Sequence, residues 1–354
     1  MRTTLSALLF VSLLPCSGAL LLPAQEPAPA NPAAPASQPA VPTLAQIQRM
    51  IDKGHPEDAL KSLEAFRGQQ PVPPGVDRVR GKALYAQYNF VEADKAFAAA
   101  MESDPHDEDA RQMRGLALYR LGKPAEAIPV LEQSHDWTDQ TKVDPSYILA
   151  LCYMDTRRYD DARHAFARQY GFAPDSAQAY LLASRMLLRR EFVPISQEYA
   201  KKALELNPDL PLAHGLLGEI ALARENLDEA ISEFEKERDR NPLYGGVYDR
   251  LGDAYSRDGD YSKAQQSLQR AVLLEPNATG PYILLGRVLF KRHDLVGAMT
   301  YLERAVKMDP SNYMSHSLLG QVYHAMGRTE DASRELKISQ DIQQGSEPKL
   351  EGIH

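Results

Sequence analysis

The stretch Pro242 to Pro276, PLYGGVYDRLGDAYSRDGDYSKAQQSLQRAVLLEP, is one complete copy of a unit that recurs along most of the chain. Small and apolar residues in it form two groups, each on one helical face: Leu251, Gly252 and Tyr255, then Ala264, Leu268 and Ala271. The turn-forming run Asp258–Asp260 separates the two groups. The pattern therefore predicts a helix, a turn, a second helix and a stop at the closing proline.

A fixed period is visible in the residues that share a place in this unit. A small residue opens each second helix, at Ala59, Ala93, Ala127, Ala162, Ser196, Ala230, Ala264, Ala298 and Ala332. Prolines close the units at Pro71, Pro105, Pro174, Pro208, Pro242, Pro276 and Pro310. The first helix carries a small residue at Gly81, Gly115, Ala150, Ser184, Gly218, Gly252, Gly286 and Gly320. Small side chains at one position predict a close approach of the paired helices.

A large residue usually stands four positions after the small residue that opens the second helix. The large residues are Leu63, Phe97, Leu131, Phe166, Phe234, Leu268, Leu302 and Leu336. Ala200 is the exception to this rule.

This helix-turn-helix period of 34 residues, with one spacing of 35, resembles the tetratricopeptide repeat family. The resemblance extends over roughly 300 residues and about nine copies. It implies an all-α fold, a right-handed superhelical α-solenoid whose first helices line a concave groove. Each helix pair cannot bury its apolar face alone, so neighbouring repeats supply the core.

The ends of the chain differ in composition from the array. Residues 1–24 carry Arg2, an apolar run and small residues, which is typical of a secretory signal peptide. Residues 25–42 are rich in Pro and Ala and predict a semi-rigid linker, residues 43–344 form the array with atypical first and last repeats, and residues 345–354 predict a disordered tail. An alternative for the N-terminus is a lipoprotein signal with Cys16 as the lipidated residue, although Pro15 departs from the usual motif.

Composition and motifs narrow the class of function. The net charge of -8 and pI near 5.7 argue against a general nucleic-acid or anionic-membrane binder. Cys16 and Cys152 do not form a disulfide framework, and Cys152 is predicted to be a buried small apolar residue. The histidines lack metal-ligand spacing, and no nucleotide-binding or nucleophile motif is present. We therefore expect neither an enzyme nor a cofactor or metal site.

Cationic residues recur where the family geometry places the groove, one and five positions after the small residue of the first helix. They are Lys82, Arg120, Arg185, Arg189, Arg257, Arg287 and Lys291. Arg185 with Arg189, and Arg287 with Lys291, lie one helical turn apart and could together bind a carboxylate. This predicts a partner with acidic side chains or a free C-terminus. The competing interpretation is an ordinary solvated face.

Two irregular places interrupt the array. Glu237, Arg238 and Arg240 replace the apolar and small residues of neighbouring copies, which predicts a soft joint near residues 237–246 unless the long side chains reach solvent. The stretch 135–145 holds the single Trp137, which could either pack over a bent connection or anchor a partner.

Together these features predict a non-enzymatic scaffold or adaptor that is exported, to the periplasm or beyond, and binds other proteins in its groove. The alternatives are a lipid-anchored assembly factor of the outer membrane and an accessory subunit or regulator of an exported enzyme. The sequence identifies neither the partner nor the oligomeric state.

Overall fold

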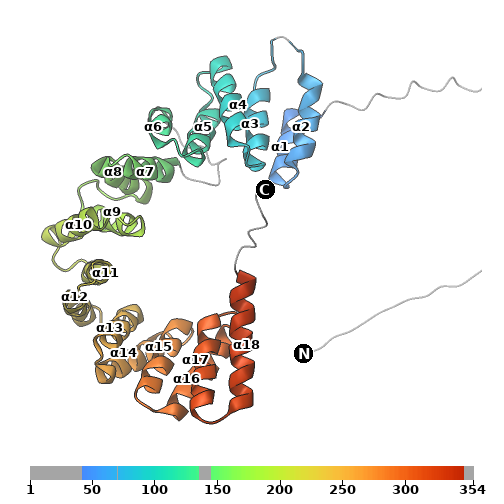
Figure 1. The fold of residues 1–354 in the computed structure, drawn as a ribbon. Helices are drawn as coiled ribbons and strands as arrows, with labels where there is room; N and C mark the ends of the chain where they lie inside the picture. Colours follow the sequence, from blue (N-terminus) through green and yellow to red (C-terminus); the bar gives the residue numbers. More distant parts are fainter. Residues whose placement is uncertain (1–41, 70, 135–144, 347–354) are drawn as a thin grey trace, which may run out of the picture. The chain divides into compact units, whose positions relative to one another are not determined.

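The computed structural model describes residues 42–69, 71–134 and 145–346, in which all regular elements are helices arranged as nine consecutive pairs (Figure 1). The first helices of the pairs are α1 (Leu44–Asp52), α3 (Val76–Ala86), α5 (Glu108–Arg120), α7 (Pro145–Asp155), α9 (Ala177–Arg189), α11 (Ala213–Ala223), α13 (Gly245–Asp258), α15 (Thr279–Lys291) and α17 (Tyr313–Ala325). The second helices are α2 (Pro56–Leu63), α4 (Phe90–Ser103), α6 (Pro124–Glu132), α8 (Tyr159–Tyr170), α10 (Val193–Leu206), α12 (Leu227–Arg240), α14 (Tyr261–Leu274), α16 (Leu295–Met308) and α18 (Thr329–Ser346). A short 3₁₀ helix, Glu64–Phe66, follows α2. The predicted all-helical array of about nine helix-turn-helix repeats is confirmed.

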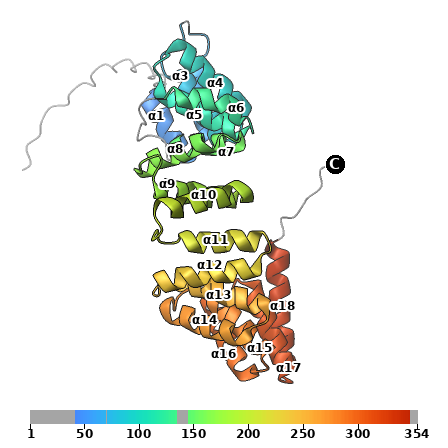
Figure 2. The same ribbon diagram turned by 90° about the vertical axis from the view of Figure 1, so that its left-hand side faces the viewer.

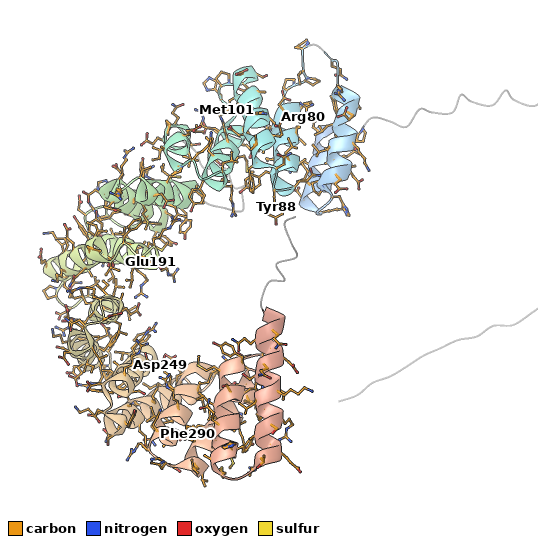
Figure 3. All side chains as sticks on the ribbon, in the orientation of Figure 1. Arg80, Tyr88, Met101, Glu191, Asp249 and Phe290 are labelled. Carbon is orange, nitrogen blue, oxygen red and sulfur yellow. The ribbon has the colours of Figure 1, made fainter. Side chains whose placement is uncertain are left out.

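The turn between the helices of each pair reverses the chain through one residue with a positive φ. These residues are Gly54, Tyr88, Gly122, Arg157, Glu191, Glu225, Gly259, His293 and Gly327, which repeat the period of the sequence. A left-handed residue just past a helix lets the following amide bond back to the helix, as when the Asn89 amide donates to the Leu84 carbonyl at 3.0 Å. Figure 3 labels Tyr88 and Glu191, two non-glycine residues at such turns.

The closing prolines end the second helices as the sequence predicts. Where a proline closes the unit after α4, α10 or α16, the residue before it, Asp104, Asn207 or Asp309, has left the helical conformation for an extended one, with ψ between 87° and 98°. Steric contact with the proline ring disfavours the helical conformation in the preceding residue. The helix therefore ends two residues before each of these prolines.

In six of the nine pairs the helices cross at a glycine of the first helix, which lies under a large side chain of the second. A Cβ added at Gly218 would lie 2.5 Å from the Phe234 ring, so only glycine allows this approach. The pair α9 and α10 differs, because Ser184 stands in place of the glycine and Ala200 in place of the large residue. Here Ser184 and Ser196 bond to each other across the two helices. The Ser184 hydroxyl donates to the Ser196 carbonyl at 2.7 Å, and the Ser196 hydroxyl donates to the Ser184 carbonyl at 2.8 Å. This explains the one exception in the row of large residues.

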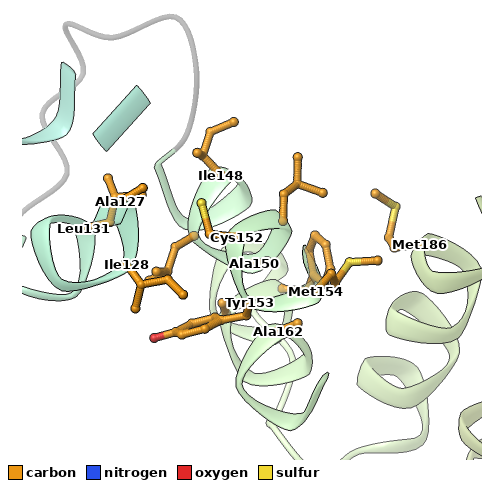
Figure 4. Close-up of a cluster of buried hydrophobic side chains, with 14 of the residues drawn as sticks. Ala127, Ile128, Leu131, Ile148, Ala150, Cys152, Tyr153, Met154, Ala162 and Met186 are labelled. Carbon is orange, nitrogen blue, oxygen red and sulfur yellow. The ribbon is translucent and has the colours of Figure 1, made fainter. Parts of the chain in front are cut away.

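The core around α7 is continuous across three helix pairs (Figure 4). Ile148 and Cys152 share one side of α7 and Met154 lies on another, and all three are buried. A helix that is apolar on every side must be buried on every side. Cys152 is a free, buried cysteine, as predicted, and burial raises the pKa of its thiol to about 12. It is therefore a packing residue rather than a nucleophile.

Successive pairs stack because each second helix packs against the next first helix (Figure 2). Tyrosines strengthen three of these junctions. The hydroxyls of Tyr153, Tyr255 and Tyr323 donate to Glu132, Glu235 and Glu303 of the preceding second helix, at 2.5, 2.6 and 2.7 Å. Each pair thus buries its apolar faces against its neighbours, as expected for a repeat array.

The two terminal repeats differ from the rest. Ile47 is fully buried at the position where later first helices place a small residue. At the other end α18 continues to Ser346, two residues beyond the predicted limit of the array. Other predictions fall outside the described residues: the signal peptide, residues 25–41 of the linker, Trp137 and tail residues 347–354.

The sequence predicts a soft joint at residues 237–246 because Glu237 places a charge where neighbouring repeats are apolar. For Glu237 this reasoning was wrong. Glu237 is fully buried within its own helix pair, where its carboxylate accepts hydrogen bonds from the amides of Leu212 at 2.9 Å and Gly215 at 3.1 Å. It therefore caps the start of α11 instead of weakening the contact with the next repeat. Arg238 forms ion pairs with Glu235 and Asp239. The joint itself stays a prediction.

Candidate partner-binding surface

The seven cations predicted to line the groove all lie on first helices. Lys82 is on α3, Arg120 on α5, Arg257 on α13, and the two pairs are on α9 and α15. The structure divides them into two sets, according to whether a carboxylate of the chain already neutralises them. Only cations without such a carboxylate keep their full attraction for an acidic partner.

Lys82 belongs to the neutralised set. Its ammonium lies 2.5 Å from Asp109, a buried residue on the next first helix, and Arg78 lies 3.6 Å from the same carboxylate oxygen. The Lys82 side chain is itself only 12% exposed. This cation therefore holds α3 against α5 and is not available to a partner.

Arg257 and Arg287 share one carboxylate, that of Asp253. Arg257 lies 2.7 Å from one Asp253 oxygen, and Arg287 on the next first helix lies 3.0 Å from the other. A similar pair joins Arg250 to Glu219 across α13 and α11 at 3.3 Å. A ladder of ion pairs thus connects three first helices, and the two basic patches expected from the sequence are not equivalent.

Asp249, labelled in Figure 3, lies one turn before Asp253 on α13. Burial raises the pKa of its carboxyl, and the charges of Asp253 and Glu275 raise it further. The charge of Arg250 acts in the opposite direction, and burial outweighs it.

Arg120 and its neighbours form a hydrogen-bonded group at the ends of first helices. The Arg120 guanidinium donates to the Tyr85 hydroxyl at 3.4 Å, and this contact raises the pKa of Arg120. The sequence did not single out Arg190, which donates to the Tyr119 hydroxyl at 2.6 Å and pairs with Asp155. Among the residues five positions after the small residue of a first helix, Asp155 is the one acidic residue. This acidic residue was the sequence signal that could have pointed to a cationic partner such as Arg190.

Arg120, Arg185, Arg189 and Lys291 form the second set. Within the described ranges, none of the four has an ion pair with a carboxylate, although Arg120 is hydrogen-bonded to Tyr85. Arg189 and Lys291 are the last residues of α9 and α15, where a cation also stabilises the carbonyl end of the helix. Arg185 has no such role, so the pair Arg185–Arg189 is the stronger candidate site for an anionic group.

A crevice beside Arg185 joins three consecutive repeats. Its lining comes from α9, α11, α12 and α13 with their preceding residues: Arg185, Leu212, Gly215, Glu219, Phe234, Tyr244, Gly246, Val247 and Arg250. Glu219 lies in the same crevice as Arg185, yet its ion pair is with Arg250. The carboxylate of the chain that shares the crevice with Arg185 is thus already engaged.

A larger cleft, of about 730 Å³, lies between the second helices α8 and α10. Its cations are Arg157, Arg158, Lys201 and Lys202, and its carboxylates are Asp160, Asp161, Glu198 and Glu205. The charges balance, so the cleft does not define the charge of a ligand. We therefore place the candidate site at Arg185 and Arg189.

Among the residues that the structure describes, no group of three or more His, Cys, Asp or Glu side chains is arranged to hold a metal ion. In the same part of the chain, no helix combines the length and the apolar character needed to cross a membrane.

Family models agree with the repeat pattern and its geometry. The tetratricopeptide repeat model matches residues 44–108, 181–244 and 250–313, and a second model of the same description matches 289–350. A model of anaphase-promoting complex (cyclosome) subunit 3 matches residues 86–169. The first model covers more than half of the chain, which therefore belongs to the tetratricopeptide repeat family.

Two curated proteins are similar to parts of the chain. One is the chloroplastic tetratricopeptide repeat domain-containing protein PYG7 of Arabidopsis thaliana, 27% identical over 96 residues, which are 26% of this chain and 32% of that protein. The other is anaphase-promoting complex subunit 3 of Schizosaccharomyces pombe, 23% identical over 224 residues, which are 63% of this chain and 33% of that protein. The chain thus spans about a third of each relative's length.

Solved structures include similar repeat arrays. YrrB, described as a TPR protein with an unusual peptide-binding site, is 24% identical with a TM-score of 0.45, over 52% of this chain and 95% of that one. Yeast Tom70 is 12% identical with a TM-score of 0.42, over 84% of this chain and 91% of that one.

Proposed function

We propose that this chain is an adaptor that captures partner proteins through Arg185 and Arg189 on α9. Proteins of its family are scaffolds for protein–protein interaction, typically without enzymatic activity. The observation that carries the proposal is the contrast between cations. Lys82, Arg257 and Arg287 already have carboxylates of the chain as partners, whereas Arg185 and Arg189 have none among the described residues.

The chemistry of this pair favours a carboxylate-bearing partner. Two guanidinium groups one helical turn apart present several N–H donors to the same region of space. A carboxylate accepts such donors in a bidentate geometry, and the charge assists each bond. The partner segment therefore carries acidic side chains or ends in a free carboxylate.

Charge reversal tests the proposal. The partners of the full chain are first identified by crosslinking and pull-down from the native source. Arg185→Glu with Arg189→Glu should abolish capture of the main partner. The matched control is Arg304→Glu with Lys307→Glu, which makes the same charge change at two exposed positions of the second helix α16. Equal capture by the two double variants would contradict the proposal.

We further propose that the protein works outside the cytoplasm, in the periplasm or as a secreted protein. The support is the composition of residues 1–24, followed by the Pro/Ala-rich segment 25–42. A lipid anchor on Cys16 is the alternative, which would make the protein an assembly factor at the outer membrane. Mass spectrometry of the mature N-terminus separates the two, because export predicts a free residue near Gln25 and the anchor predicts acylated Cys16.

An accessory role for an exported enzyme is a further possibility within the same adaptor class. It predicts that one enzyme co-purifies with the chain in a fixed ratio. A set of unrelated partners in variable ratios would instead favour a general scaffold.

A further inference from the structure

Exposed apolar side chains lie beside Arg185, at the loops that lead into α11 and α13. Leu212 directly precedes α11 and is 36% exposed, while Tyr244 directly precedes α13 and is 46% exposed. Both side chains line the crevice that also contains Arg185. Leu243, next to Tyr244 in the chain, is 75% exposed. We call Leu212 and Tyr244 the apolar ledge.

The backbone at Leu212 does not favour the residue that stands there. Leu212 has a φ of +68°, a conformation that is costly for a bulky residue and easier for glycine or asparagine. Neither Leu212 nor Tyr244 caps the helix that it precedes with its side chain. Leu212 is therefore retained at a cost in stability, while the Tyr244 ring lies over Gly246, where an added Cβ would be 2.7 Å away from it.

We propose that the partner segment is amphipathic, with a carboxylate that binds Arg185 and Arg189 and a nearby apolar side chain that packs on the ledge of Leu212 and Tyr244. This inference rests on the proposed function and specifies its partner. The chain's own carboxylate in the crevice, Glu219, is paired with Arg250 at 3.3 Å and does not neutralise Arg185. The carboxylate that pairs with Arg185 and Arg189 therefore comes from the partner. The apolar contact follows from the exposure of the ledge, because covering apolar surface stabilises a complex.

The size of the crevice decides how the apolar group binds. The enclosed space is about 20 Å³, which is enough for a water molecule and too little for a side chain. The partner's apolar group therefore lies across Leu212 and Tyr244 instead of entering a pocket. A contact of this kind favours an aliphatic or aromatic residue close in sequence to the acidic group.

The test uses peptides as probes and the full chain as target. A displayed library of random linear 12-residue peptides is selected on the immobilised full chain. The enriched peptides are then synthesised with free and with amidated C-termini, and their dissociation constants are measured by fluorescence anisotropy at low and high salt. The two synthetic forms distinguish a terminal carboxylate from an acidic side chain.

The ledge variant is Leu212→Asn with Tyr244→Ser. Asn tolerates the left-handed conformation, and Ser at the residue before a helix can cap it, so this variant should remain folded. Leu273→Ser is the matched control, because Leu273 is also exposed, at 69%, and lies outside the crevice. Thermal unfolding of each variant checks that the array is intact.

We expect the enriched peptides to contain an acidic and an apolar residue close together. The ledge variant should bind them about tenfold more weakly or worse, and this loss should persist at high salt. The control should bind as the unmodified chain does. Peptides that lose affinity on charge reversal of Arg185 and Arg189 but bind the ledge variant normally would overturn this inference and leave the proposed function standing. Peptides insensitive to both changes, or no enrichment at all, would count against both.

Discussion

The carboxylate of Glu237, near the end of α12, accepts hydrogen bonds from the amides of Leu212, the residue before α11, at 2.9 Å and of Gly215 at 3.1 Å. In other first helices the N-cap side chain accepts from the third amide of the helix, as Ser176 does from Ala179 in α9. Leu212 has no side chain for that purpose, so the partner helix provides the acceptor.

Removing this carboxylate should destabilise the middle of the array. Glu237→Ala leaves the partly buried amides of Leu212 and Gly215 without their acceptor, which should cost about 1–3 kcal/mol in total. The urea midpoint should fall clearly. Glu198→Ala, at an exposed position of the neighbouring second helix, should change it little. Equal midpoints for the two variants would show that the cap contributes nothing.

The left-handed turns predict opposite effects of glycine at equivalent positions. Glu225 and Gly259 occupy the same place in neighbouring repeats, with φ of 59° and 87°. Glu225→Gly should raise the free energy of unfolding by about 1 kcal/mol, because the backbone strain disappears. Gly259→Ala should lower it by about the same amount, although its Cβ would contact nothing within 4 Å.

The prediction for Glu225→Gly needs one control. Glu225→Ala removes the same carboxylate but keeps the Cβ, so thermal unfolding should show no comparable gain. A gain of equal size in both glutamate variants would assign the effect to lost charge and not to the backbone.

Two helical glycines should respond differently to the same substitution. Gly218→Ala places a Cβ 2.5 Å from the Phe234 ring and should cost about 1–3 kcal/mol through overpacking. Gly280→Ala meets nothing within 4 Å apart from its chain neighbours, and the ring of Pro281 offsets the gain in helix propensity, so the change should stay below about 1 kcal/mol. Chemical denaturation of both variants checks the pair, and a loss at Gly280 as large as that at Gly218 would refute the packing argument.

The tyrosine contacts between repeats predict a loss of stability at alkaline pH. Burial, with the hydrogen bond to Glu303, raises the pKa of Tyr323 from 10.0 to about 12. Between these values the unfolded chain loses the proton while the folded chain keeps it. The contribution of this group is therefore complete below pH 10 and declines as the pH approaches 12.

Tyr323→Phe isolates this contribution. The stability difference between the unmodified chain and the variant, measured by urea denaturation, should become less favourable to the unmodified chain from pH 9 to pH 12. Tyr88→Phe is the control, because the Tyr88 side chain is 82% exposed. A constant difference over this range for Tyr323→Phe would contradict the assignment.

Much of the fold follows from the sequence, because its determinants are local and periodic. The period of 34 residues places the helix turns, the closing prolines and the glycine positions, and each depends on residues close in the chain. The structure adds the reason for the one exception. Ala200 stands opposite Ser184, so a smaller second-helix residue accompanies a larger first-helix residue.

The candidate site was only partly predictable. The rule that selected Arg185 and Arg189 also selected Lys82, Arg257 and Arg287, because all lie on the same face of a first helix. Whether such a cation is free depends on carboxylates that the fold brings from other repeats, such as Asp109 and Asp253. Ion pairing acts over a few ångströms in space, whatever the separation in sequence.

The sequence by itself therefore determined that this protein is a helical repeat array and which positions of each repeat carry charge. Only the tertiary structure decided which charges remain available, that Glu237 caps α11, and that Leu212 and Tyr244 lie beside Arg185. The physical reason is that repeat architecture follows from local steric and apolar periodicity, whereas a binding surface follows from pairing across neighbouring repeats.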